Sequence, residues 1–228
     1  MLAVLYDIHG NLPALEAVLD DASASGAERY VLGGDYALFG PWPRECVERL
    51  RELDADWIRG NGERWTARAT DAPQDEVVQS AVAACANMVG PQLVAELAAL
   101  PFELRGDGVR YVHASPLSDV RSFGPLHDDS EEEMLGGVLE RRLVFGHTHL
   151  QFRRQASGGV ELVNPGSVGM PFDDDHRAAY ALVAPGGELE LRRVEYDHER
   201  TVAAVRERFD DPLADTVARR IAHARFEP

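Results

Sequence analysis

The sequence predicts an α/β fold in which two β-sheets pack together in one domain, and three observations support this prediction. Short apolar runs near the N-terminus alternate with helical patterns, which is typical of parallel β-α-β units. Later apolar runs are separated by glycine-containing turns, which favour antiparallel hairpins. The chain has 228 residues, enough for one compact domain or at most two small ones. We find no linker, internal repeat or low-complexity tract that would divide it.

The first part of the chain predicts three strands, each followed by a polar loop. An apolar run at residues 3–6 precedes apolar residues at helical spacing over 12–20. A second strand is expected at 29–32, before a helix that begins at Pro43. A third short strand is expected at residues 57–58. Right-handed crossovers would place these strands in one parallel sheet.

The rest of the chain predicts helices first and hairpins later. Residues 73–100 are rich in alanine and helical in pattern, with a break expected at Gly90-Pro91. Strand-like runs then occur at 109–112, 142–145, 160–163, 179–183 and 189–194. The glycine turns at 157–159 and 185–187 suit hairpins. Apolar spacing over 199–224 indicates two amphipathic helices that cover a sheet face or an oligomer contact.

Charge and cysteine content narrow the class of protein. Lysine and arginine total 23 and aspartate and glutamate 39, which gives a formal charge of −16. This charge disfavours a nucleic-acid partner, because phosphate backbones are held by basic patches. An anionic substrate would need local cations, which metal ions can supply.

The apolar runs and the cysteines indicate where the protein works. No apolar run approaches the roughly 18 residues of a membrane-spanning helix, so no membrane partner is expected. The run from Leu2 to Tyr6 lacks the basic flank of a secretory signal. The cysteines, Cys46 and Cys85, do not form a disulfide framework. We therefore expect a cytoplasmic protein, and a homo-oligomer is compatible with this pattern.

Residues with oxygen or imidazole donors follow the strand-like runs. They are Asp7, His9, Asp35, Asn61, His113, His147 and His149. Loops at the carboxyl ends of strands meet in one crevice in open α/β sheets. Together these donors could bind two divalent cations roughly 3.5–4 Å apart, as in sites that cleave phosphoesters. Asp35 is the natural bridging ligand, because the two oxygens of a carboxylate can each contact one ion.

Each of these residues also has an ordinary structural explanation when it is considered alone. Asp7 and His9 fit a turn and a helix cap, and Asn61 between two glycines fits a turn. His113 fits a hydrogen-bonded core histidine. These explanations do not account for donors in five separate segments.

The order of the motifs resembles that of the calcineurin-like metallophosphoesterases, from Leu2 to about Leu191. The family signature is D-x-H, G-D, G-N-H-D/E, a lone H and then G-H-x-H. It stands here as Asp7-Ile8-His9, Gly34-Asp35, Gly60-Asn61-Gly62-Glu63, His113 and Gly146-His147-Thr148-His149. Residues 7–19 and 163–169 are most similar to the small single-domain bacterial branch of phosphodiesterase type.

The resemblance implies both a fold and a division of the ligands. The fold would be a four-layer α-β-β-α sandwich of two mixed sheets flanked by helices, in one domain over residues 1–228 with helices at about 199–224 packed on it. One metal ion would be held by Asp7, His9, Asp35 and His149. The second would be held by Asp35, Asn61, His113 and His147. Among these ligands, Asp35, Asn61 and His147 are expected to contribute directly to catalysis. The imidazoles favour Mn²⁺, with Fe, Zn²⁺ or Ni²⁺ also suitable, over Mg²⁺ or Ca²⁺.

Two positions depart from the family pattern. The histidine that usually follows the metal-binding asparagine is Gly62 here, so a group that could protonate the leaving group is missing. His127 and His176 are the histidines in nearby loops that could replace it. An arginine that often follows Asn-Pro-Gly-Ser-Val-Gly is also missing from residues 170–173, although Arg177 is close by.

We therefore expect a dinuclear metal-dependent phosphohydrolase that cleaves a small phosphoester with a metal-bound hydroxide. The substrate would be a phosphodiester, or an activated phosphomonoester or phosphoanhydride, including those derived from nucleotides. The alternative is a catalytically weak protein-interaction module of the same fold, since Gly62 is a change that can accompany lost turnover. The retained donors favour the enzyme, because a scaffold does not need them.

Overall fold

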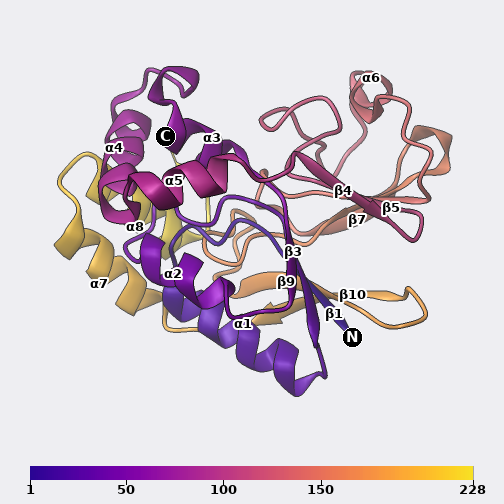
Figure 1. Cartoon of the computed structure of the whole chain (residues 1–228), viewed down its shortest axis with the longest axis horizontal. Helices are drawn as coiled ribbons and strands as arrows, with labels where there is room; N and C mark the ends of the chain where they lie inside the picture. The colour runs from indigo at the N-terminus through magenta and orange to yellow at the C-terminus, as the bar shows by residue number, and fades with distance from the viewer. Residues whose placement is uncertain (228) are drawn as a thin grey trace.

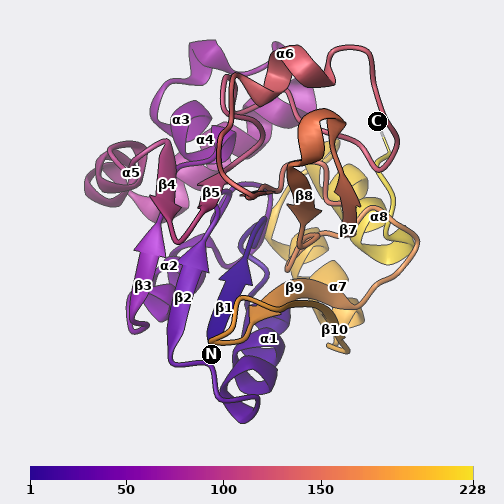
Figure 2. The same ribbon diagram turned by 90° about the vertical axis from the view of Figure 1, so that its right-hand side faces the viewer.

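Two five-stranded sheets form the centre of the computed structural model, which describes residues 1–227 (Figures 1 and 2). The strands of the first sheet are β1 (Leu2–Leu5), β2 (Arg29–Leu32), β3 (Ala55–Trp57), β9 (Ala178–Val183) and β10 (Leu189–Val194). Those of the second are β4 (Glu103–Gly106), β5 (Val109–Val112), β6 (Arg142–Val144), β7 (Phe152–Gln155) and β8 (Glu161–Asn164). The strand orders are β10-β9-β1-β2-β3 and β4-β5-β6-β8-β7.

The pairing of the strands is mixed in both sheets. In the first sheet β1, β2 and β3 are parallel, and β9 and β10 are antiparallel additions. In the second sheet β5, β6 and β8 are parallel, and the edge strands β4 and β7 are antiparallel to their neighbours. The predictions of early parallel units and of later hairpins at 157–159 and 185–187 are confirmed. Because parallel strands end at the same edge of a sheet, the loops after β1, β2 and β3 emerge together.

Helices flank the two sheets. They are α1 (Leu12–Ala24), α2 (Pro43–Leu50), α3 (Asn61–Ala67), α4 (Glu76–Val89), α5 (Pro91–Ala98), α6 (Glu131–Leu135), α7 (His198–Arg208) and α8 (Leu213–His223). In Figure 1, α1, α2 and α7 lie on one side of the first sheet, and the second sheet lies on the other side with α6 beyond it. The four-layer α-β-β-α arrangement is therefore confirmed, with α6 as the helix of the outer layer on the second sheet.

Buried apolar side chains hold these layers together. In α1, Leu15, Val18 and Leu19 recur on one buried face, and the Asn11 side chain caps the helix by accepting from the Ala14 N–H at 3.3 Å. Between the sheets lies a second cluster that includes Val4, Val31, Val144 and Val163. A third cluster under α6 contains Phe123, Phe145 and Met134. Each sheet therefore buries its two faces in different clusters.

The two C-terminal helices extend the helical layer. α7 and α8 pack against each other, and they contact α1 and α4, respectively. Val205, Val217 and Ile221 on these helices are buried in the same cluster as α1. The break between helices at Gly90-Pro91 and the two helices over 199–224 are confirmed.

Several elements, among them β4, β7, α3 and α6, were not predicted from the sequence. β4 and β7 are four-residue edge strands that carry charged residues, and α3 begins where Gly60-Asn61-Gly62 indicates a turn.

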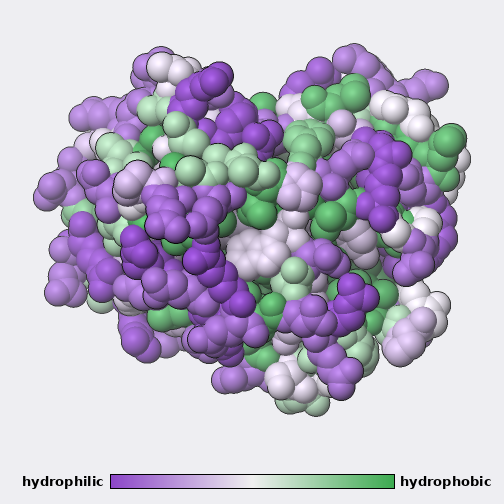
Figure 3. Space-filling model, viewed as in Figure 1, coloured by the Kyte–Doolittle hydropathy of each residue, from purple (hydrophilic) through white to green (hydrophobic). Residues whose placement is uncertain are grey.

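Cys46 and Cys85 are free and buried. Hydrophilic residues cover most of the face shown in Figure 3, with apolar residues scattered among them. Within residues 1–227, no single helix has the length and apolar composition to cross a membrane; α4 and α5 meet that test only as a pair bent by 111°.

Candidate metal centre

The loops that follow five strands bring the predicted donor residues together. In strand order these are Asp7 and His9 after β1, Asp35 after β2, Asn61 after β3, His113 after β5, and His147 and His149 after β6. All are buried except His147, which is partly exposed. The backbone is left-handed at five of them, with φ of 55° at Asp7, 48° at His9, 56° at Asp35, 68° at His147 and 58° at His149. Such values are uncommon outside glycine, so the loops are sharply bent where they direct the donors inward.

Asp7, His9 and His149 form the first group of donors. The Nε2 atoms of His9 and His149 are 3.1 Å apart, and Asp7 Oδ1 lies 3.5 Å from His149 Nε2. The Nδ1 atom of His9 lies 2.9 Å from the Leu38 carbonyl, and that of His149 lies 2.6 Å from the Met170 carbonyl. Because a carbonyl can only accept, the protons belong on Nδ1. Both Nε2 lone pairs therefore face each other and Asp7.

This group fits a cation. Asp7 Oδ2 accepts from the His147 N–H at 2.9 Å, but Asp7 Oδ1 is buried and has no hydrogen-bond partner among residues 1–227. Leaving a buried carboxylate oxygen unsatisfied costs free energy, which a metal ion at this position would offset. Proteins orient histidine ligands by hydrogen-bonding the other ring nitrogen to a carbonyl, as His9 and His149 do here.

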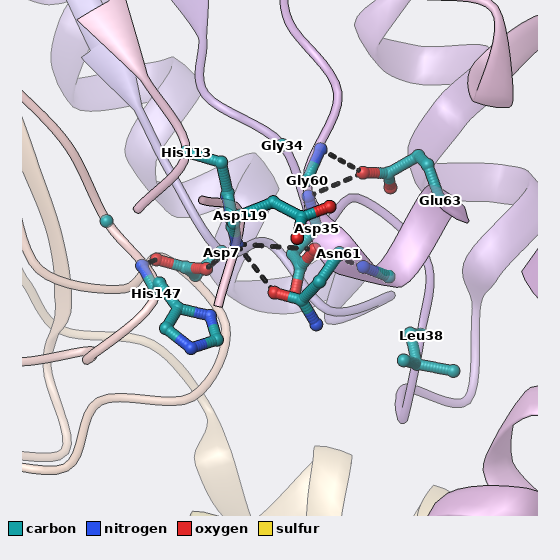
Figure 4. A network of polar contacts seen from close by, with 12 residues as sticks. Asp7, Gly34, Asp35, Leu38, Gly60, Asn61, Glu63, His113, Asp119 and His147 are labelled. Atoms are coloured by element: carbon teal, nitrogen blue, oxygen red, sulfur yellow. Dashed lines mark hydrogen bonds and ion pairs between the residues drawn. The ribbon is translucent and has the colours of Figure 1, made fainter. Parts of the chain in front are cut away.

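His113, Asp35, Asn61 and His147 form the second group, and Figure 4 shows their side chains gathered together. The Nδ1 atom of His113 lies 2.8 Å from the Gly33 carbonyl, which again leaves Nε2 as the free lone pair. This Nε2 lies 3.0 Å from the carboxamide oxygen of Asn61. With the amide reversed, its nitrogen would donate to His113 Nε2 and, at 2.8 Å, to His147 Nδ1. In the orientation that keeps the carboxamide oxygen beside His113, Asn61 would offer an acceptor to a cation.

Asp35 lies between the two groups. Its Oδ2 is 3.9 Å from His9 Nε2, and its Oδ1 is 3.5 Å from His113 Nε2. Asp7 Oδ1 also lies 3.9 Å from His113 Nε2, so both carboxylates adjoin both groups. Asp35 directs a different oxygen to each group, a geometry that would let one carboxylate contact two ions.

Burial shifts the pKa values of these residues. It raises the pKa of Asp35 to about 7, against the attraction of His113. It lowers the pKa of His9 to about 3 and that of His147 to about 4, and neighbouring imidazoles act in the same direction. Near pH 7 these two imidazoles are neutral, which is the form that coordinates metals. Because burial disfavours the ionised form of Asp35, an adjacent cation would stabilise its carboxylate.

Glu63 fixes the loops that carry Asp35 and Asn61. Its Oε2 accepts from the N–H of Asp35 at 2.9 Å and from that of Gly60 at 2.8 Å. Its Oε1 accepts from the Tyr36 N–H at 2.9 Å. Figure 4 shows the Glu63 carboxylate reaching these loops from α3. The end of β2 and the start of α3 are therefore tied together behind the donors.

Asp119 adjoins the second group, although no sequence motif indicates it. The Nε and Nη2 atoms of Arg64 donate to its two oxygens, both at 2.7 Å. Burial would raise the pKa of Asp119, but the Arg64 guanidinium holds it below its usual value. Asp119 lies next to Asn61 in Figure 4, so this ion pair secures the loop after β5 against α3.

The residues expected to replace missing family groups have other partners. His127 pairs with Glu131 at 3.1 Å, and His176 stacks on His198 with ring centroids 4.6 Å apart. Arg177 donates to the aspartate two residues before it. None of these contacts involves the donor residues, so we do not assign an acid or a phosphate-binding role to any of the three.

Comparisons with known proteins show the family to which this chain belongs. A family model described as a calcineurin-like phosphoesterase superfamily domain matches residues 1–186. The chain is 28% identical over 218 residues to an uncharacterized protein of Methanocaldococcus jannaschii, covering 86% of this chain and 88% of that protein. It is 30% identical over 179 residues to phosphodiesterase YfcE of Escherichia coli, covering 72% and 77%. The crystal structure of a metallophosphoesterase from Sphaerobacter thermophilus matches with a TM-score of 0.79 at 27% identity, covering 98% of each chain.

Proposed function

Because this chain belongs to the calcineurin-like phosphoesterase superfamily, we propose that it hydrolyses small phosphoesters with two divalent metal ions held by its convergent donors. The relatives support a hydrolase that acts on phosphoester bonds. What carries the finer proposal is the convergence of three Nε2 lone pairs, those of His9, His113 and His149, each with its Nδ1 on a backbone carbonyl.

The donors divide between two ions as the family resemblance implies. Asp7, His9, Asp35 and His149 would hold one ion, and Asp35, Asn61, His113 and His147 would hold the other. Neutral imidazoles combined with carboxylates favour Mn²⁺, and Fe, Zn²⁺ or Ni²⁺ also suit this donor set. Two bound ions would supply Lewis acidity toward a phosphoryl oxygen and a nucleophile at neutral pH.

The protein's own groups would orient these ligands and exclude water from them. The carbonyls of Leu38, Met170 and Gly33 fix the imidazole rings, and Glu63 fixes the loop of Asp35. The side chain of Asp7 also accepts the backbone N–H of His147, which ties the loops after β1 and β6. Because six of the seven donors are buried, their electrostatic interactions are stronger than in water.

Gly62 sets the expected substrate preference. Glycine cannot donate a proton to the leaving oxygen, and general acid catalysis is typically worth about 10²–10⁴-fold. We therefore propose that phosphodiesters and phosphoanhydrides with acidic leaving groups, such as aryl esters, are cleaved far better than alkyl phosphates. The formal charge of −16 and the absence of a basic motif favour small substrates over nucleic acid.

We also propose that the chain works as one domain in the cytoplasm. The helices α7 and α8 share an apolar cluster with α1, which supports one domain that includes them. Free, buried cysteines are typical of a reducing compartment.

The proposed activity is tested with bis(p-nitrophenyl) phosphate, a small diester with a good leaving group. Turnover should appear when Mn²⁺ is added to metal-free protein and should disappear with a chelator. His149→Gln should lose at least about 100-fold in kcat/KM, because a metal ligand is removed. His127→Gln is the matched control, since His127 pairs with Glu131 and is mostly exposed. Absence of turnover with every divalent metal and phosphoester would overturn the proposal and favour an interaction module.

A further inference from the structure

Arg220 on α8 is a buried arginine without a carboxylate partner. The residue is 8% exposed, and its Nε donates to the Glu227 backbone carbonyl at 2.7 Å. Within residues 1–227, no carboxylate oxygen lies within 4.0 Å of its guanidinium. Burial lowers the pKa of Arg220, although the carboxylates of Asp75 and Glu227, both beyond ion-pair distance, act in the opposite direction. Burying a charge without a close counter-ion costs free energy, and an anion bound to Arg220 would reduce that cost.

The other buried arginines differ in this respect. Arg110 pairs with Glu103, and Arg142 pairs with Glu161. Among the described residues, Arg220 is therefore the buried arginine that has no carboxylate oxygen within 4.0 Å of its guanidinium.

Two aromatic rings hold the guanidinium of Arg220. Its central carbon lies 4.6 Å from the centroid of Phe226 and 5.9 Å from that of Phe39. Rings above a guanidinium cover its flat faces and leave the N–H groups at its edge free to donate. No hydrogen bond from Nη1 or Nη2 to another described residue accompanies the Nε contact. The side chain is therefore held through Nε and flanked by two rings, and its terminal nitrogens have no hydrogen-bond partner among residues 1–227.

The same rings connect Arg220 to the metal centre. Phe39 lies 6.0 Å from the His9 ring, and Phe226 lies 5.6 Å from Phe172, which stacks on His149 at 4.4 Å. Arg220 is thus one aromatic ring away from His9, on the side of the group formed by Asp7, His9 and His149. Phe39 has a φ of 74°, a conformation that bulky residues rarely adopt and that is concentrated at functional sites.

The segment that carries Phe226 is fixed against the centre. The Ala224 carbonyl accepts from the Asp174 N–H at 3.0 Å, and the side chains of His223 and Glu227 lie 2.6 Å apart. These contacts place Phe226 next to Phe172, which is within the loop missing the family arginine. On the side of His9 and His149, the C-terminal helix α8 therefore brings a cation, Arg220, toward the position where that loop lacks the family arginine.

We propose that Arg220 binds a second phosphate of the substrate, separate from the phosphoryl group that is hydrolysed. Phe39 keeps the guanidinium one ring away from His9, so an anion there is a different group from one held at the metal ligands. The substrate class is a small phosphodiester or phosphoanhydride that carries an additional phosphate. This inference rests on the proposed function and adds a specificity-determining residue to it.

The test uses two chromogenic esters that differ in one group. They are thymidine 5′-(p-nitrophenyl phosphate) and the same ester with a 3′-phosphate. The native Mn²⁺-loaded protein should have a KM about 10- to 100-fold lower for the 3′-phosphorylated ester, the range expected for a charge-assisted hydrogen bond. The kcat values should be similar, because a remote contact binds the ground state and the transition state alike.

Arg220→Gln should abolish this preference by raising KM for the 3′-phosphorylated ester only. Arg220→Lys, which keeps the charge, should retain part of it. Arg206→Gln is the matched control, because it removes one positive charge from an exposed position of α7. Thermal melting confirms that each variant is folded. Equal preference in native protein and Arg220→Gln, or no preference in the native protein, would overturn the inference.

A binding measurement separates this inference from the proposed function. Calorimetry on metal-free protein compares thymidine 3′,5′-bisphosphate with thymidine 5′-monophosphate. The bisphosphate should bind about tenfold or more tightly to the native protein, and Arg220→Gln should remove the difference. If this dependence is found but no ester is hydrolysed with any metal, the proposed activity fails and the anion site stands. If esters are hydrolysed but the bisphosphate binds both proteins equally, only the anion site fails.

Discussion

Gly62 occupies the place of the family's histidine, and its lack of a side chain makes room for Asp35. A Cβ at this position would lie 2.9 Å from Asp35 Oδ1 and 3.3 Å from Leu38 Cβ. The Gly62 N–H donates to the same Asp35 oxygen at 2.7 Å. Gly62 is therefore part of the support for the bridging carboxylate as well as the site of a missing acid. Restoring the histidine would displace Asp35 unless the loop moved.

Gly62→Ala should weaken metal binding because its methyl group displaces Asp35. We expect a loss of about tenfold or more in Mn²⁺ affinity, the usual range for disturbed groups that position a ligand. Calorimetric titration of the metal-free protein measures this loss. Gly186→Ala is the control, because no atom lies within 4 Å of a Cβ built there. Unchanged affinity in Gly62→Ala would show that Asp35 does not depend on this close contact.

Asp35→Asn should leave at least one of the two metal positions empty. The change removes negative charge from the residue that faces both groups, so the charges of two ions would be less compensated. Elemental analysis after dialysis gives the metal content per chain, and Asp54→Asn provides a control at an exposed aspartate. Two ions per chain at native affinity, with normal turnover, would contradict the bridging role.

The donor residues could be predicted from the sequence because each follows an apolar run in a short motif. Asp119 and Arg220 could not, since neither belongs to a motif. Asp119 reaches the site through its ion pair with Arg64, and Arg220 through two rings, Phe39 and Phe226, distant in sequence. Such contacts depend on how segments pack, which periodicity does not encode.

Among the elements, β8 is joined to both of its neighbours by Glu161. The Glu161 carboxylate pairs with Arg142 on β6 and with Arg153 on β7. Its side chain is 12% exposed. Burial opposes its ionisation, but the two guanidinium groups hold the pKa of Glu161 below its usual value. The folded state is thus favoured when Glu161 is ionised.

Glu161→Gln should destabilise the protein at neutral pH and much less in acid. Because the folded pKa lies below the unfolded value, the ion pairs stabilise the fold above about 4.5 and are lost as pH falls through the folded pKa. Urea unfolding at pH 7 should show a loss of about 1–2 kcal/mol relative to native, and the difference should shrink near pH 3. Glu188→Gln, at an exposed position of the β9–β10 turn, should show neither effect. An equal deficit at both pH values would exclude the electrostatic cause.

The strands that enclose the site were predictable, whereas β4 and β7, the edge strands of the second sheet, and α3 were not. β1 and β9 are runs of apolar residues because their faces are covered by helices or by the other sheet. β4 and β7 lie at sheet edges, where charged residues are tolerated and the apolar signal is weak. α3 starts with Asn61 and Gly62, which are poor helix formers, and contacts made by Glu63 and Arg64 secure it.

Across the whole molecule, the packing of one sheet on the other assembles the metal centre. Asp7, Asp35 and Asn61 come from the first sheet, and His113, His147 and His149 come from the second. Tyr6, next to Asp7, is fully buried between the sheets and donates its hydroxyl to the Val144 carbonyl at 3.1 Å. The distance between the two sets of ligands is therefore fixed by a close-packed apolar layer.

The sequence predicted two sheets and two C-terminal helices but not this relative placement. The amphipathic pattern of residues 199–224 indicates helices with one buried face without indicating what that face contacts. In the structure they pack on α1 and α4, which brings the end of α8 to the rim of the centre. Tertiary contacts of this kind, between residues far apart in the chain, lie outside the reach of periodicity and motifs.

Anomalous diffraction from crystals of the Mn²⁺-loaded protein tests the dinuclear centre most directly. The account predicts two peaks per chain, roughly 3.5–4 Å apart, with Asp35 between them. One peak should lie within bonding distance of Asp7, His9 and His149, and the other within bonding distance of Asn61, His113 and His147. A single peak, two peaks that do not share Asp35, or peaks away from these residues would contradict it.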